Sequence, residues 1–132
     1  QHILESLSGY LLLAQKMLEG QKSFDQAWNF GPQQNANLTV LEVLSRIKKD
    51  WSSLRWEEKS SPKYHESSLL YLDSSKAHKF LNWKSVWSVD ESIQETISWY
   101  KSFINKGNIL SMSQLQRYVE KAKSLGIEWS IN

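Results

Sequence analysis

Cysteine is absent from this chain of 132 residues, which excludes disulfide bonds and zinc sites built on thiolates. No apolar run approaches the roughly 20 residues that a membrane-spanning helix needs, and the first residues lack the pattern of a signal peptide. Lys and Arg number 16 against 14 Asp and Glu, without a basic patch interleaved with aromatic residues. We therefore expect a cytoplasmic protein whose partners include neither nucleic acid nor a membrane.

Glycine is also scarce, which excludes one kind of cofactor site. The five glycines occur singly, so the chain lacks the Gly-rich turn that lets a backbone approach a dinucleotide pyrophosphate. No tyrosine is followed four residues later by lysine, no Gly-x-Ser-x-Gly occurs, and His2, His65 and His78 lack the spacing of metal ligands. We expect no catalytic, cofactor-binding or metal-binding residue in this chain.

The length fits one domain, residues 1–132, and is too short for a cofactor domain and a substrate domain together. No repeat or linker divides the chain. Seven tryptophans are many for this length. Aromatic faces stack on sugars and bases, but Trp51, Trp83 and Trp99 stand in or beside expected helices, where large rings normally fill a core.

Apolar residues at helical spacing, together with capping signals, predict five helices. The first helix spans 5–19 with Gly20 just beyond it, and its apolar residues include Leu7, Leu11 and Leu18. Thr39 and Ser88 each begin a capping box, and Asp73 is a natural N-cap. The other helices are expected from Thr39 to about Asp50, over 74–81, from Ser88 to a point just before Gly107, and over 113–125.

Three short apolar or aromatic segments predict strands: 27–30, 54–57 and 69–72. Gly31-Pro32 would close the first of them, and polar runs at 33–37 and 59–62 are typical of loops. The expected fold class is therefore α/β, mainly helical with a few short strands.

Polar residues in the expected loops are candidates for ligand contacts. His65 and Glu66 precede an expected buried strand, where side chains of a loop can reach a ligand, and an exposed pair without a role fits equally well. Asn37 stands just before a helix N-terminus. It could donate to a phosphate there, or satisfy local backbone groups.

Five stretches of the sequence match a known family pattern: QHILESLSGYLLLA (1–14), AWNFGP (27–32), HESSLLYLDSSKAHKFLNW (65–83), ISWYKSF (97–103) and, less specifically, SQLQRYVEK (113–121). They resemble the CDP-glucose 4,6-dehydratases, which are extended members of the short-chain dehydrogenase/reductase superfamily. The pattern at 73–83 is shared widely among nucleotide-sugar epimerases and dehydratases, whereas residues 1–2, 7–11 and 28–32 favour the CDP-glucose branch.

The resemblance implies that the chain is the C-terminal substrate-binding lobe of such an enzyme, with the N-terminal NAD-binding Rossmann domain missing. Roughly 200 further residues would then lie upstream, the size of a cofactor domain. The intact enzyme would convert CDP-glucose to CDP-4-keto-6-deoxyglucose and water, for dideoxy sugars of surface polysaccharide such as lipopolysaccharide O-antigen. It would use NAD and form a homo-oligomer, and the isolated chain would be inactive with an unusually apolar surface.

The resemblance also implies four substrate-binding residues. His2 matches a histidine in an extended segment near the substrate cleft, and His65 and Glu66 match a pair beside the nucleotide. Asn37 resembles an asparagine that approaches the diphosphate in dTDP-glucose relatives, although the usual CDP-glucose pattern differs there. Ser6 also departs from the family, which generally has proline, and the Arg-Pro-Trp that precedes Gln-His in the family is missing.

Two other interpretations remain open at this stage. The lobe could belong to another nucleotide-sugar dehydratase or to an epimerase. A free-standing helical module that binds a carbohydrate or a protein through its aromatic residues is the alternative from a different class.

Overall fold

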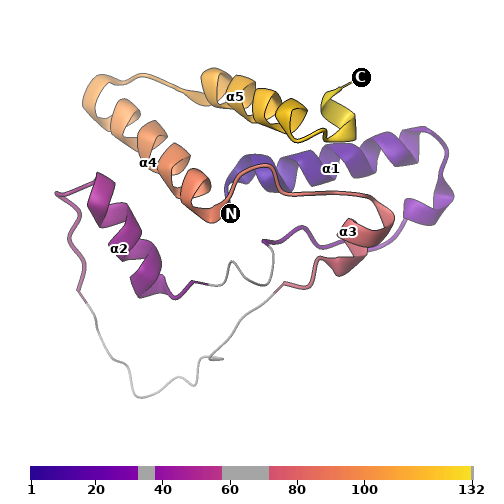
Figure 1. Ribbon diagram of the computed structural model, residues 1–132, viewed down its shortest axis with the longest axis horizontal. Helices are drawn as coiled ribbons and strands as arrows, with labels where there is room; N and C mark the ends of the chain where they lie inside the picture. The colour runs from indigo at the N-terminus through magenta and orange to yellow at the C-terminus, as the bar shows by residue number, and fades with distance from the viewer. Residues whose placement is uncertain (33–37, 58–71, 132) are drawn as a thin grey trace, which may run out of the picture.

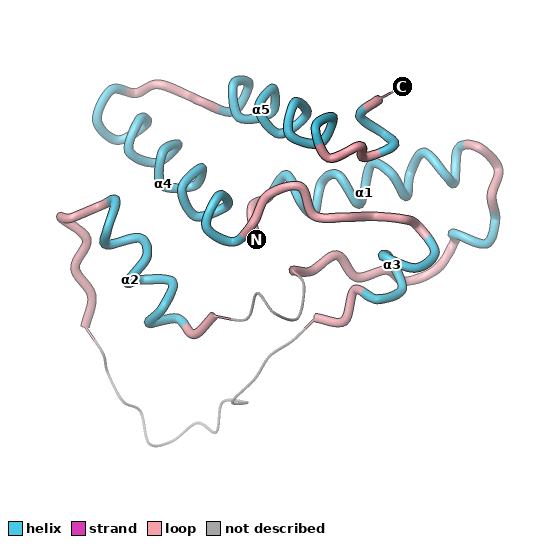
Figure 2. Tube along the Cα trace, viewed as in Figure 1, coloured by secondary structure: helices cyan, strands magenta, loops and turns pink. Residues whose placement is uncertain are grey.

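The computed structural model describes residues 1–32, 38–57 and 72–131. Within these ranges the regular structure is helical and contains no strand (Figure 2). The elements in chain order are α1 (Ile3–Leu18), η1 (Lys22–Phe24), α2 (Val40–Asp50), α3 (Ser75–Phe80), α4 (Val89–Lys106), α5 (Ser111–Ser124) and η3 (Glu128–Ser130).

The five helices predicted from the sequence are confirmed, with ends shifted by one or two residues. Both predicted capping boxes form: the Thr39 hydroxyl accepts from Glu42 N at 3.2 Å, and the Ser88 hydroxyl accepts from Glu91 N at 3.2 Å. Gly107 ends α4 at a φ of 68°, in the left-handed region that glycine adopts without strain. These signals are local, so the sequence alone sufficed to place the helices.

The start of α3 differs slightly from the prediction. Its N-cap is Ser74, whose side chain makes no capping bond, whereas Asp73 Oδ1 accepts from Ser75 N at 2.9 Å. Asp73 thus provides the acceptor for an N–H group of the first turn, although it stands one residue before the N-cap.

The strands expected at 27–30 and 54–57 are wrong, because neither segment has a partner strand among the described residues. Side chains pair some of their carbonyls instead: Ala27 O accepts from Lys76 Nζ at 2.9 Å, and Leu54 O accepts from Lys48 Nζ at 2.6 Å. An apolar segment indicates burial, but a sheet also needs a second strand in register. The third expected strand lies outside the described residues except for Leu72, which is not in a strand. The described part is thus mainly helical, as expected, and not α/β.

Helix α1 lies between two buried clusters. One joins Val86, Trp87, Tyr118, Ala122 and Ile127, with Leu4 of α1 packed against it. The other joins Phe30, Ala77, Leu81 and Trp83, with Leu12 and Leu13 of α1 packed against it. The expectation that Trp83 fills a core is confirmed, since its side chain is almost fully buried.

Figure 1 shows α4 and α5 running in opposite directions on one side of α1, with α2 beside α4. The N-terminal residues lie where the start of α1 meets the start of α4. Segments far apart in the sequence therefore surround the first two residues of the chain.

The buried side of α1 is not the side on which the regularly spaced apolar residues lie. Glu5 and Gly9 are buried, whereas Leu11 is 71% and Leu18 is 90% exposed. Gly9 allows the ring of Phe30 to approach, because a Cβ there would lie 2.3 Å from Phe30 Cδ1. The spacing correctly predicted a helix, and the packing of Phe30 decided its orientation.

Candidate functional site

The amide of Gln1 ties the start of α1 to the segment that ends at Phe30. Gln1 Nε2 donates to Phe30 O at 2.9 Å and to Ser6 Oγ at 2.5 Å. Gln1 also lines three separate hollows, whose volumes are about 380, 370 and 460 Å³. We treat these hollows around Gln1 as the candidate site, because His2, one of the expected substrate-binding residues, lines the largest of them.

His2 is the one expected site residue that the structure describes. It is 7% exposed and is the N-cap of α1, where its Nδ1 accepts from Leu4 N at 3.3 Å. Its ring meets the Trp87 ring edge-on at 4.9 Å between centroids. Burial lowers the pKa of His2, against the opposing field of Glu95. Because Nδ1 accepts a hydrogen bond, the imidazole that caps α1 is neutral.

The first hollow, of about 380 Å³, lies between α2 and the residues that lead into α4. Arg46 of α2 lines it and pairs with Asp90 of α4. Ser85 and Ser88 add hydroxyl groups to the same wall. The hollow therefore combines one guanidinium, which is paired with Asp90, with hydroxyl groups and the carboxyl group of Glu5.

A buried carboxylate holds the wall of this hollow. Glu5 is 1% exposed, and its Oε1 accepts from Trp87 N at 2.8 Å while its Oε2 accepts from Val86 N at 3.1 Å. The Tyr118 hydroxyl also lies 3.1 Å from Oε2. Burial raises the pKa of Glu5, and these hydrogen bonds oppose that rise. Glu5 thus fixes the main chain at 86–87 before α4 begins.

The second hollow is mainly apolar and lies between α2 and α4. Its lining includes Val43 and Ile47 of α2 and Ile93 and Ile97 of α4, with Thr96 as one of the polar side chains. Such a surface suits an apolar group rather than a charged one.

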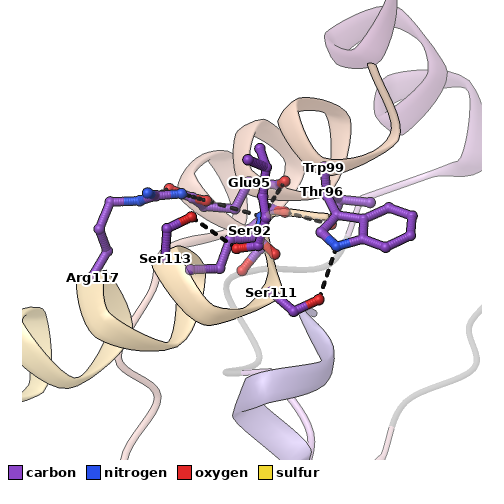
Figure 3. A network of polar contacts seen from close by, with 9 residues as sticks. Ser92, Glu95, Thr96, Trp99, Ser111, Ser113 and Arg117 are labelled. Carbon is purple, nitrogen blue, oxygen red and sulfur yellow. Dashed lines mark hydrogen bonds and ion pairs between the residues drawn. The ribbon is translucent and has the colours of Figure 1, made fainter. Parts of the chain in front are cut away.

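A polar network joins α4 to α5 beside the third hollow (Figure 3). Arg117 donates to both carboxylate oxygens of Glu95, at 3.0 and 2.7 Å, and Gln114 Nε2 donates to Glu95 O at 2.6 Å. Trp99 Nε1 donates to Ser111 Oγ at 3.0 Å. The bond from Arg117 is the main cause that lowers the pKa of Glu95. These bonds fix the wall of the hollow that faces His2.

The other expected site residues, Asn37, His65 and Glu66, lie outside the described residues, so their assignment stays a prediction. Gln1, Glu5 and Arg46 were not among the site residues expected from the sequence. Glu5 carried no local signal, because its carboxylate accepts from main-chain groups 81 and 82 residues away. Arg46 carried none, since it stands in a helix with other basic residues and meets the hollow only through folding.

No group of three or more His, Asp and Glu side chains in the described ranges is arranged to hold a metal ion. None of the helices described in them is long and apolar enough to cross a membrane.

No known protein-family model matches the chain. A curated protein, an enzyme of the dehydratase class, is similar to the chain. The alignment covers 115 residues, which are 86% of the chain, at 32% identity. That protein is the CDP-glucose 4,6-dehydratase of Salmonella typhimurium. The resemblance inferred from the sequence is thereby confirmed. The matched residues make up 32% of the relative, so the chain spans about a third of its length.

Proposed function

We propose that the chain is the substrate-binding part of a CDP-glucose 4,6-dehydratase, which converts CDP-glucose to CDP-4-keto-6-deoxyglucose and water. The observation that carries this proposal is the similarity over 86% of the chain to a protein of that name. The motifs at 1–2, 7–11 and 28–32 support the CDP-glucose branch over other nucleotide sugars.

NAD binding and catalysis belong, in this proposal, to an additional N-terminal Rossmann domain. The chain does not fit NAD, because its five single glycines leave no Gly-rich turn for the pyrophosphate. NAD supplies the chemistry of taking a hydride from the sugar and returning it. The isolated chain is therefore expected to be inactive.

The contribution of this chain is to hold the nucleotide so that the glucose is positioned for reaction. Binding energy far from the reacting carbon serves orientation, and a well-oriented substrate loses part of its entropic barrier. His2, Asn37, His65 and Glu66 are the proposed contacts. Arg46 lines the first hollow and would attract a diphosphate there, in competition with Asp90, which pairs with it in this structure.

A product assay on the full-length protein from the source gene tests the activity. The protein is supplied with NAD and, in parallel, with CDP-, dTDP-, GDP- and UDP-linked hexoses, and mass spectrometry scores the loss of water. Dehydration confined to CDP-glucose is expected. Dehydration of another nucleotide sugar would contradict the base assignment, and no reaction with any of them would favour the helical binding module instead.

The role of His2 is tested in the same assay with His2→Asn. Asparagine is among the best N-cap residues, so this variant keeps a cap on α1 while it removes the imidazole. If His2 contacts the substrate, KM for CDP-glucose rises about tenfold, which corresponds to the loss of one good hydrogen bond. Unchanged KM with unchanged kcat would leave His2 as a capping residue only.

A further inference from the structure

The exposed side of α1 is almost entirely apolar. Eight of its residues are exposed, and Gln15 is the only polar one among them. None carries a charge. We call the other seven the apolar face of α1: Ile3, Leu7, Tyr10, Leu11, Ala14, Met17 and Leu18.

The opposite side of the same helix is already buried. Residues follow one another at about 100° around a helix, which places Glu5, Gly9 and Leu12 on the side away from Leu7 and Leu11. A helix that buries one side normally turns polar and charged residues toward solvent on the other. Single exposed leucines are ordinary, but a contiguous apolar patch marks a surface that another element covers.

We propose that the apolar face of α1 docks against the part of the parent protein that lies outside these 132 residues. This inference rests on the proposed function only in requiring a longer parent protein. The curated relative leaves room for such an occupant, because the matched residues make up 32% of its length.

The chemistry of the face favours a permanent occupant from the same polypeptide. Permanent interfaces are more apolar than those that exchange, and charged residues are depleted at their centres. An occupant in the same chain is also present at a high effective concentration. The absence of any charge from the apolar face of α1 fits this case better than a partner that dissociates.

Cysteine labelling of the full-length protein tests the proposal. The 132 residues contain no cysteine, so Leu11→Cys adds the single thiol within them. The control variants are Leu41→Cys on α2 and Leu125→Cys at the end of α5, where the leucines are 57% and 53% exposed. Each variant reacts with a maleimide under native conditions and in concentrated urea, and peptide mass spectrometry measures labelling at the new site.

Under native conditions we expect Leu11→Cys to be labelled at least about tenfold more slowly than either control, because burial protects the thiol. In urea the three variants should be labelled at equal rates. Equal native rates would overturn the proposal. Protection that disappears on dilution would overturn the proposal and indicate that a second copy of the chain covers the face. A reading frame confined to these residues would also overturn the proposal. Labelling needs no nucleotide sugar, so protection without dehydration would contradict only the proposed activity.

Discussion

Helices α1 and α5 have similar lengths, 16 and 14 residues, but expose opposite kinds of surface. Each has eight exposed residues. In α1 seven of them are apolar, whereas in α5 six are polar and only Met112 and Leu115 are apolar. Helix α5 therefore has the usual surface of a helix that borders solvent, and α1 does not.

Among the described residues, the apolar side of α5 is covered by other elements and much of the apolar side of α1 is not. Tyr118 and Ala122, on the apolar side of α5, lie in a buried cluster that also contains Trp87. In α1 the buried side contains a glutamate and a glycine, and much of the apolar surface is left over. Changes on either side of α1 should therefore have very different effects.

The largest effect is expected from Glu5→Ala on the buried side. The buried N–H groups of Val86 and Trp87 would lose their acceptor, which should lower the free energy of unfolding by about 3 kcal/mol or more. Urea unfolding measures this loss. Glu120→Ala on the exposed side of α5 is the control and should change stability by less than about 0.5 kcal/mol. Equal losses in both variants would contradict the role of Glu5.

Gly9→Ala tests the contact between α1 and Phe30. Alanine should stabilise an exposed helix by about 1 kcal/mol relative to glycine. Here the added Cβ would lie 2.3 Å from Phe30 Cδ1, so a loss of about 1 to 3 kcal/mol is expected instead. The sign of the change in thermal unfolding decides between the two, with the exposed Gln15→Ala as control. A gain would show that Phe30 does not pack on Gly9.

A smaller effect concerns pH and the cap of α1. Burial lowers the pKa of His2 below 6.5, so the unfolded chain takes up a proton first as the pH falls. The contribution of His2 to stability is present above pH 6.5 and is lost as the pH falls through the lowered pKa of the folded state. Urea midpoints between pH 7.5 and pH 5 measure this loss, about 1 kcal/mol for an N-cap.

His2→Asn is the control for this pH dependence, because asparagine caps a helix without titrating. The raised pKa of Glu5 acts in the opposite direction, since its carboxylate becomes less unfavourable to bury as protons bind. The difference between the two proteins isolates His2, as both retain Glu5. An equal pH dependence in both would contradict the assignment.

On helix α5, Arg117→Ala should lower the free energy of unfolding by a smaller amount. The guanidinium donates to both oxygens of Glu95 but is 45% exposed, so solvent screening leaves about 0.5 to 1 kcal/mol. The difference between the variant and the natural protein should shrink in 1 M salt, because salt screens exposed pairs. A loss that does not change with salt would indicate packing by the arginine stem instead.

The smallest effect is expected on the apolar face of α1. In the isolated chain Leu11→Ala should change stability by less than about 0.5 kcal/mol, because the side chain contacts mainly solvent. Leu13→Ala, two residues away on the buried side, should cost about 2 kcal/mol because Leu13 packs against a buried cluster. Similar losses by urea unfolding would contradict the orientation of α1.

The helices could be predicted because their signals are local. Apolar spacing, the capping boxes at Thr39 and Ser88, and the glycines after α1, α4 and α5 all lie within a few residues of the structure they specify. The strands could not be predicted in the same way, since a strand depends on a distant partner. The contacts of the candidate site are distant as well: Glu5 and Val86 are 81 residues apart.

By itself the sequence determined where the helices begin and end and which known proteins the chain resembles, because capping, periodicity and motifs are properties of neighbouring residues. Only the tertiary structure decided that Glu5 holds residues 86–87, that Gln1 lines three hollows, and that α1 turns its apolar face outward. The physical reason is that burial depends on what the rest of the chain places against each side of a helix. For α1, the close approach of Phe30 to Gly9 settled which side that is.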